Sequence, residues 1–306
     1  MARVIAILNQ KGGVGKTTTA MNLSAYLALS GKRTLLVDFD PQFNATVGMG
    51  VTHAPDETIY HLLFTEQELS QVVKQTSLFN LDMIPASADL AGALVEMIEV
   101  SEREWMLRRL IDRLRDQYDF ILIDLGPSLN LLTVNGLLAA NEVIVPIQCE
   151  YYSLEGLGQL VQTITLIREN LSHPLKVTGA LLTMFDKREK LSREVAREVR
   201  RRFPHRVFDV EIPRSVSLAE APSYRKPIML YDPQSTGAQA YERLAREVIR
   251  YAEEDSLGTT DASSGQEPQN NMKEEDANEA LKKQHEDQQE REKEDFPRYE
   301  PPLQIL

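Results

Sequence analysis

The chain of 306 residues has a single cysteine, Cys149, and no long apolar stretch. One thiol can form neither a disulfide within the chain nor a cysteine-rich metal site, which fits a reducing cytoplasm. No apolar run approaches the roughly 18 residues that a membrane-spanning helix needs. The first residues pass directly into a β-rich run without the pattern of a signal peptide. We therefore expect a cytoplasmic protein.

The excess of acidic residues lies at one end of the chain. The formal net charge is −12, but residues 253–306 hold 16 acidic and 6 basic residues, a net charge of −10. Residues 1–252 therefore carry only −2, which leaves room for a basic surface patch. The acidic balance of the whole chain thus does not argue against binding to nucleic acid.

Residues 253–306 also differ from the rest of the chain in composition. Gly, Ser, Thr, Gln and charged residues dominate without an apolar face, so burial cannot offset the chain entropy. We predict a folded domain over residues 1–252 and a disordered acidic tail over residues 253–306. Its last residues, 296–306, are rich in aromatics and proline, and serve either as the end of a tether or as a docking peptide for a partner.

Apolar β-rich runs alternate with amphipathic helical patterns through residue 252. This alternation predicts an α/β domain with a mostly parallel, twisted sheet and helices on both faces. The expected strands span residues 4–8, 34–37, 81–85, 120–123, 143–147, 177–184 and 207–212. The expected helical stretches span residues 17–29, 88–118, 129–140, 154–171, 191–203 and 237–253. Ligands of such sheets bind at the carboxyl ends of the strands.

The segment KGGVGKTT lies between the first expected strand and the first expected helix. Strand, glycine-rich loop and helix form the context that a phosphate-binding loop requires. The glycines let the backbone curl so that its amides point at phosphate oxygens, aided by the positive end of the helix. Lys16 is placed to reach the β- and γ-phosphates, and Thr17 to ligate Mg²⁺. The predicted nucleotide-binding residues here are Lys11, Gly12, Gly13, Val14, Gly15, Lys16, Thr17 and Thr18.

Lys11, at the start of this loop, has two explanations from the sequence alone. It lies at the far end of the loop from its own γ-phosphate, but it could reach a phosphate that is bound by another subunit. A solvated lysine with no role explains the residue equally well.

Three aspartates follow or end expected strands. Asp124 ends the run ILID, the position at which phosphate-loop proteins hold Mg²⁺ through water. Asp38 and Asp40 stand two residues apart, which places both on the same side of an extended segment. One of them can support the metal shell while the other orients the attacking water. Because Asp40 precedes a proline, a structural turn is the alternative for this residue.

Seven segments together closely resemble the ParA/Soj family of chromosome- and plasmid-partitioning ATPases. From about residue 2 to residue 252 they read KGGVGKTT, VDFDPQFNAT, ILIDLGPS, PIQCEYYSLEGL, LLTMFDKR, IPRSVSLAEAPS and YDPQSTGAQAY. The resemblance implies a cytoplasmic, nucleoid-associated ATPase with a deviant Walker A loop and with ATP and Mg²⁺ as cofactors. It also implies an ATP-sandwich homodimer that binds double-stranded DNA non-specifically, until a ParB-like centromere-binding protein stimulates hydrolysis and releases it.

The resemblance assigns roles to individual residues as well. Lys11 matches the signature lysine that contacts nucleotide across the dimer, Asp40 the catalytic aspartate and Asp124 the Walker B aspartate. The expected catalytic residues are thus Lys11, Lys16 and Asp40, and the expected metal-binding residues are Thr17, Asp38 and Asp124.

The same resemblance marks positions around the base and on the DNA-binding face. In the family, segments that contain Met184, Asp186 and Pro213 border adenine. Arg188 matches a position that is implicated in DNA binding. The expected DNA-binding residues are Arg188, Arg200, Arg201 and Arg214.

Two positions depart from the family pattern. Ser217 replaces an arginine that the family uses to bind DNA. The loss of one phosphate contact would lower the slope of log affinity against log salt concentration by about one unit. Arginines at 200–202 could compensate, although basic residues at a helix end also suit the helix dipole. Gly126 replaces a proline in the usual D-x-P-P-S and loosens the backbone after Asp124.

Three other functions compete with this one. A MinD-like positioning ATPase shares the loop, but that family ends in a basic amphipathic helix, whereas residues 253–306 are acidic, so no stable membrane binding is expected. A nitrogenase-type iron protein needs cluster cysteines that Cys149 alone does not supply. A non-hydrolysing nucleotide-switch scaffold is disfavoured because all the expected catalytic groups are present.

Overall fold

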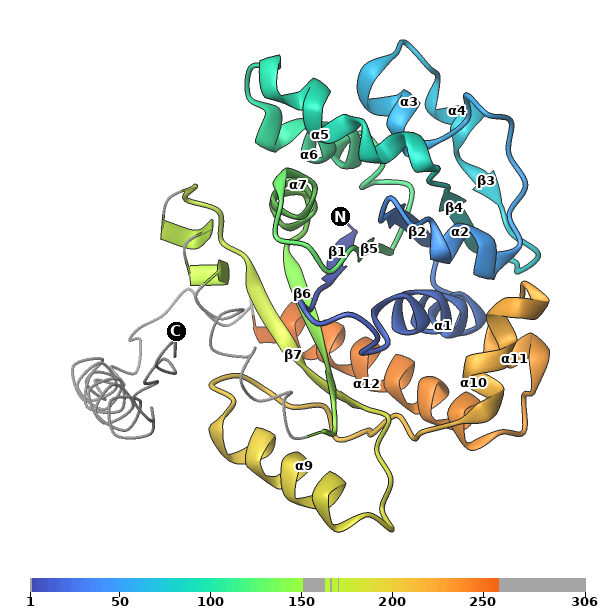
Figure 1. Ribbon diagram of the computed structural model, residues 1–306, viewed down its shortest axis with the longest axis vertical. Coiled ribbons are helices and arrows are strands. Elements are labelled where there is room, and N and C mark those ends of the chain that lie inside the picture. Colours follow the sequence, from blue (N-terminus) through green and yellow to red (C-terminus); the bar gives the residue numbers. More distant parts are fainter. Residues whose placement is uncertain (1, 151–162, 166, 170, 259–306) are drawn as a thin grey trace, which may run out of the picture. The chain divides into compact units, whose positions relative to one another are not determined.

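The structure, a computed structural model, describes residues 2–150, 163–165, 167–169 and 171–258. Within these residues one seven-stranded sheet has the order β3-β4-β2-β5-β1-β6-β7 (Figure 1). All neighbouring strands are parallel except the edge strand β3, which is antiparallel to β4. The strands are β1 Arg3–Ile7, β2 Thr34–Phe39, β3 Lys74–Gln75, β4 Leu81–Ile84, β5 Phe120–Leu125, β6 Glu142–Gln148 and β7 Lys176–Thr183.

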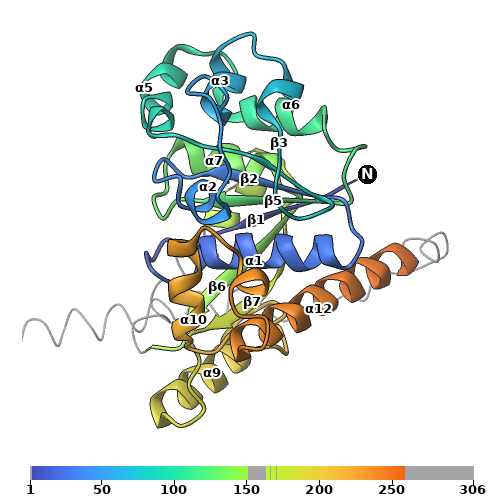
Figure 2. The same cartoon turned by 90° about the vertical axis from the view of Figure 1, so that its right-hand side faces the viewer.

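Helices cover both faces of the sheet. They are α1 Lys16–Leu29, α2 Asn44–Met49, α3 Ile59–Phe64, α4 Leu69–Val72, α5 Ala93–Glu96, α6 Met106–Asp112, α7 Leu131–Ala139, α9 Lys190–Arg202, α10 Val216–Glu220, α11 Ile228–Tyr231 and α12 Thr236–Gly258. Helices α1, α10 and α12 lie on one face, and α3 and α5–α7 on the other (Figure 2). Helix α11 packs against α1. Each face of the sheet has its own hydrophobic core, and successive strand residues alternate between the two. Ile5 and Ile7 lie in the core beneath α1 and α12, and Val4 and Ala6 lie in the core beneath α6 and α7. The predicted α/β fold is confirmed.

Six of the predicted strands are present, with ends that differ by one or two residues. The seventh, over residues 207–212, is wrong. Its pairing is irregular, because isolated bridges join Val207 to Ala180 of β7 and Pro213 to Phe185 just beyond β7. The Phe208 and Ile212 amides donate to the Ala180 and Leu182 carbonyls of β7. The backbone amides of Asp209 and Val210 donate instead to the carboxylate of Glu247 in α12, at 2.9 and 3.3 Å. A side-chain acceptor therefore interrupts, between Phe208 and Ile212, the ladder of hydrogen bonds that a continuous strand would need.

Replacing Glu247 by alanine is expected to lower the free energy of unfolding by about 2–3 kcal/mol, because two backbone amides and the buried Tyr251 phenol would lose their acceptor. Glu247 is only 7% exposed, and the Tyr251 phenol also donates to it. Urea unfolding measures the change. The matched control E242A removes an exposed carboxylate from the same helix and should cost less than about 0.5 kcal/mol. An equal loss in both variants would contradict the anchoring role of Glu247.

The single helical stretch predicted over residues 88–118 is also wrong. The chain there forms α5, α6 and three 3₁₀ turns, at Ala88–Ala91, Met97–Glu99 and Arg103–Trp105. Val100 is extended and Glu102 has a φ of +53°, so a continuous helix cannot form. Asn135 of α7 fixes the break, because its side chain donates to the Arg103 carbonyl and accepts from the Leu107 amide. A tertiary contact thus overrides the local pattern.

Two predictions fall on parts of the chain outside the described residues. The helix expected over residues 154–171 lies largely in such a segment, and so does most of the acidic tail, residues 259–306. In the described part of the chain, no helix combines the length and the apolar character needed to cross a membrane.

Candidate active site

The glycine-rich loop joins the end of β1 to the start of α1. Gly13 and Gly15 have φ angles of +74° and +88°, which residues with a side chain rarely adopt. The backbone amides from Gly13 to Lys16 make no hydrogen bond with other described residues, so they can bind an anion. The Thr183 hydroxyl at the end of β7 donates to the Val14 carbonyl at 2.9 Å and ties the loop to the sheet. This role of Thr183 was not predicted from the sequence.

Lys16 is the first residue of α1 and is almost completely buried. Its ammonium group donates to the Lys11 carbonyl at 3.1 Å, across the mouth of the loop. Burial lowers the pKa of Lys16 from its ordinary value, while the charges of Asp124 and Asp40 oppose this shift. The predicted lysine and the two predicted aspartates therefore meet at one place.

Asp124 lies near the end of β5 with no solvent exposure, and neither carboxylate oxygen has a hydrogen-bond partner among the described residues. Burial, followed by the charge of Asp38, raises the pKa of Asp124 well above its ordinary value. The Thr17 hydroxyl lies near enough to offset part of this rise, but its geometry is not that of a hydrogen bond. Two unpartnered buried oxygens beside a phosphate loop fit a nearby cation.

No cluster of three or more His, Cys, Asp or Glu side chains suited to a metal ion occurs in the described part of the chain. This does not count against Mg²⁺, which usually keeps several waters and is bound by one or two protein groups together with substrate phosphates. Thr17 and Asp124 supply oxygen donors of this type. The residues present therefore fit a magnesium–nucleotide complex better than a metal held by the protein alone.

Asp38 pairs in register with Asp124 on the neighbouring strand, but its carboxylate is already engaged. The amide and the hydroxyl of Thr46 donate to it at 2.8 and 2.7 Å, and the Asp40 amide donates at 3.3 Å. Burial raises the pKa of Asp38 to about 6 despite these hydrogen bonds. Asp38 thus anchors α2 to the end of β2, and the geometry favours a supporting role over direct contact with a metal.

Asp40 follows β2 and is almost completely buried. One oxygen accepts the Gln42 amide at 3.0 Å, which fixes the side chain within a turn. Gly126 packs against the same carboxylate, because a Cβ atom added there would lie 3.2 Å from an Asp40 oxygen. Gly126 therefore lets Asp40 approach the end of β5 closely, a consequence of the departure from D-x-P-P-S that only the structure displays.

A cavity of about 270 Å³ opens beside the loop. Met184 and Pro213, both predicted near adenine, line it together with Gly15 and Thr18. Met184 has a φ of +51°, an uncommon conformation for a residue with a side chain. Other residues that line this cavity are Thr183, Ile212, Arg214, Ser215, Leu218, Ala219 and Tyr241. Tyr241 ends the segment YDPQSTGAQAY but was not predicted at the site; its phenol hydrogen-bonds the Thr19 hydroxyl at 3.1 Å.

Asp186, the third residue predicted near adenine, does not line this cavity. Its carboxylate instead forms an ion pair with Arg188 at 2.7 Å. Hydrogen bonds from Arg188 lower the pKa of Asp186 to about 2. The ion pair thus connects Asp186, which was predicted to lie near adenine, with Arg188, which was predicted to bind DNA.

The four predicted DNA-binding arginines all have partners within the chain. Arg188 and Arg201 have highly exposed side chains and single carboxylate partners, Asp186 and Glu198. Arg200 is more buried and also donates to the backbone carbonyls of Phe208 and Asp209, which indicates a structural role. Arg214 pairs with Glu150 at 3.1 Å. Ser217, which departs from the family pattern, donates to Asp232 at 2.8 Å.

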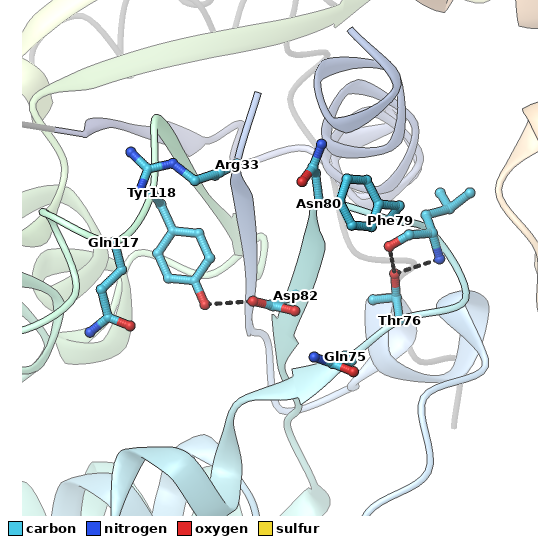
Figure 3. A pocket seen from close by; sticks show the side chains of 9 residues that line it. Arg33, Gln75, Thr76, Phe79, Asn80, Asp82, Gln117 and Tyr118 are labelled. Atoms are coloured by element: carbon cyan, nitrogen blue, oxygen red, sulfur yellow. Dashed lines mark hydrogen bonds between the residues drawn. The ribbon is translucent and has the colours of Figure 1, made fainter. Parts of the chain in front are cut away.

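A larger cavity, of about 610 Å³, lies elsewhere, near the amino ends of β2, β4 and β5 (Figure 3). Arg33, Phe79 and Asn80 line it, and the Tyr118 phenol donates to Asp82 at 2.8 Å across one side. Because the strands are parallel, this edge is opposite the one that carries the phosphate loop. The smaller cavity beside the loop is therefore the better candidate for a nucleotide base.

Comparison with known proteins identifies similar sequences and structures. A family model described as "AAA domain" matches residues 2–177. The chain is 50% identical over 249 residues to the chromosome-partitioning ATPase Soj of Treponema pallidum, over 81% of this chain and 98% of that protein. It is 49% identical, with the same coverage, to the sporulation initiation inhibitor protein Soj of Bacillus subtilis.

A solved structure resembles the fold as well. Cobyrinic acid a,c-diamide synthase from Mycobacterium smegmatis, with bound ADP and magnesium, matches with a TM-score of 0.73 at 37% identity, over 83% of this chain and 97% of that one. Together, the fold and the glycine-rich loop define a P-loop nucleotide-binding ATPase. Within that class the chain belongs to the Soj/ParA family of chromosome-partitioning ATPases.

Proposed function

We propose that this protein is a magnesium-dependent ATPase that moves DNA by forming an ATP-bound homodimer, which holds DNA non-specifically until hydrolysis releases it. The observation that carries the proposal is the buried Asp124 carboxylate, whose two oxygens have no hydrogen-bond partner among the described residues and lie beside a loop whose amides are likewise unpaired there. A buried carboxylate without a partner is costly, and a bound cation near a phosphate compensates for that cost.

In this proposal, different residues of the site bind the phosphates, hold Mg²⁺ and orient the attacking water. The amides from Gly13 to Lys16 and the Lys16 ammonium bind the phosphates, while Thr17 and Asp124 hold Mg²⁺ directly or through water. Bound Mg²⁺ supplies positive charge that neutralises the phosphate oxygens. Asp40 orients the attacking water, and its hydrogen bond to the Gln42 amide restricts its motion.

Lys11 makes the nucleotide part of the dimer interface in this proposal. Its side chain is 38% exposed, and among the described residues its ammonium group forms only a weak ion pair, so a phosphate of a partner subunit can compete for it. The family to which the chain belongs supports DNA as the cargo, with a ParB-like protein as the partner that stimulates hydrolysis. We place the protein in the cytoplasm, associated with the nucleoid, with residues 1–252 as the ATPase domain.

Retention on non-specific duplex DNA tests this function. With Mg²⁺ and ATP the protein should be retained, with ADP it should not, and retention should fall steeply as salt rises. Retention that is the same in ATP, in ADP and without nucleotide would overturn the proposal. Co-sedimentation with anionic phospholipid vesicles in ATP, without DNA retention, would support a MinD-like positioning ATPase instead.

Arg188→Ala is expected to weaken ATP-dependent DNA retention roughly tenfold and to lower the slope of log affinity against log salt by about one, because one phosphate contact is lost. The matched control is R246A, which removes another highly exposed arginine with a single carboxylate partner, on α12. DNA titrations between low and moderate salt measure both slopes. Equal behaviour of R188A and R246A would remove Arg188 from the DNA-binding face.

A further inference from the structure

Glu150, directly after β6, lies between two cationic side chains of the site. Its carboxylate forms an ion pair with Lys11 at 3.7 Å and another with Arg214 at 3.1 Å. The side-chain amide of Gln148 donates to the same carboxylate at 2.6 Å and holds it in place. None of the roles assigned above to the loop, the metal or the DNA-binding face uses Glu150.

The two cations that Glu150 binds belong to different parts of the site. Lys11 starts the phosphate loop, while Arg214 lines the cavity beside Gly15. The charge of Arg214 also helps to lower the pKa of Asp186, the residue that binds Arg188. A series of side chains with alternating charge therefore connects the phosphate loop to the predicted DNA-binding face. In order, its members are Lys11, Glu150, Arg214, Asp186 and Arg188.

We propose that Glu150 is a positioning residue that holds Lys11 within its own subunit and so restrains formation of the ATP-bound dimer. The proposal rests on the function proposed above, in which Lys11 must reach a phosphate of the partner. Within one subunit, Lys11 has the Glu150 carboxylate as its anion. In the dimer a phosphate of the partner's nucleotide competes with Glu150 for the same ammonium group. The equilibrium between monomer and dimer therefore depends on the negative charge of the bound triphosphate.

The ion pair is suited to such competition because it is weak. The side chains of Lys11 and Glu150 are 38% and 46% exposed, so water screens the pair. A pair of this kind favours the restrained position by roughly threefold. Two subunits each release one lysine, so the two factors multiply and dimerisation should be restrained by about tenfold.

The test compares the dimerisation constants of E150Q and the wild type in the presence of Mg²⁺ and a non-hydrolysable ATP analogue, by analytical ultracentrifugation. E150Q keeps the size of the side chain and removes its charge, and it should dimerise about tenfold more tightly. E150D keeps the charge and should stay close to the wild type. E242Q, which removes a carboxylate of similar exposure paired with one arginine on α12, should match the wild type.

The outcomes separate this inference from the proposed function. If the wild type dimerises with the ATP analogue but not with ADP, and E150Q has the same dimerisation constant, the restraining role of Glu150 is overturned while the proposed function stands. If the wild type forms no nucleotide-dependent dimer, both are overturned. An equal gain in E150Q and E242Q would assign the effect to general charge and would also overturn the role of Glu150. Unchanged thermal unfolding midpoints check that all variants fold.

Discussion

Asp40→Ala should reduce ATP turnover at least about 100-fold, the range in which loss of one positioned polar group at a phosphoryl-transfer site falls. The carboxylate is almost completely buried, is fixed by the Gln42 amide and lies against Gly126, so no neighbouring water can replace it in the same geometry. Binding of ATP should survive, because the phosphate loop is untouched. Phosphate release at saturating ATP, in the presence of DNA, measures the effect.

Two comparisons make the D40A result specific. D40N keeps the acceptor for the Gln42 amide and removes the charge, so it should be nearly as inactive as D40A. D119A removes a partly exposed carboxylate that pairs with Arg33 at the opposite edge of the sheet, and its turnover should match the wild type. ATP-dependent DNA retention should persist in D40A for longer than in the wild type, because release requires hydrolysis. If D40A and the wild type turned over at equal rates, Asp40 would have no catalytic role.

Asp124→Asn should have two opposite effects. The nucleotide-free protein should become more stable at pH 8, by about 2 kcal/mol or about 5 °C in Tm, because an unpartnered buried carboxylate is replaced by a neutral group. The additional stabilisation that Mg²⁺ gives to the ATP-bound wild type over ATP with EDTA should disappear. Thermal unfolding of both proteins, with and without Mg²⁺ and ATP, measures both effects.

The pH dependence follows from the direction of the pKa shift at Asp124. Its pKa is raised in the folded protein, mainly by burial and then by the charge of Asp38, so the folded state binds a proton that the unfolded state has lost. The contribution of Asp124 to the free energy of unfolding is therefore least favourable at high pH and becomes more favourable as the pH falls toward about 4. The advantage of D124N should be largest at pH 8 and should shrink on acidification. An advantage that is independent of pH would contradict the burial of an uncompensated carboxylate.

Contiguous features of the sequence predicted most of the fold. Apolar runs of β-rich residues between helical patterns predicted six strands and the mostly parallel sheet, because a strand buried on both faces needs a continuous apolar run. The glycines at 13 and 15 predicted the phosphate loop, since the curled backbone needs positive φ angles. The parallel sheet then brought Lys16, Asp40 and Asp124 to one edge, where their charges interact.

Features that depend on partners distant in sequence could not be predicted in this way. The prediction of the seventh strand failed because Glu247, 37 residues away from Val210, accepts the backbone amide that would have continued the pairing with β7. The helix over residues 88–118 failed because Asn135 of another helix holds the chain in a turn. Local propensity is weak compared with one buried hydrogen bond of this kind.

The phosphate loop, the three aspartates and the family could be predicted from short runs of neighbouring residues. The folded structure distinguished the aspartates from one another: Asp38 is engaged by Thr46, Asp40 is fixed beside Gly126, and Asp124 has no hydrogen-bond partner among the described residues. It also brought Glu150 to Lys11 and Arg214 across the site. The physical reason is that burial and the pairing of charges depend on which strand ends the fold brings together, and no local pattern encodes that.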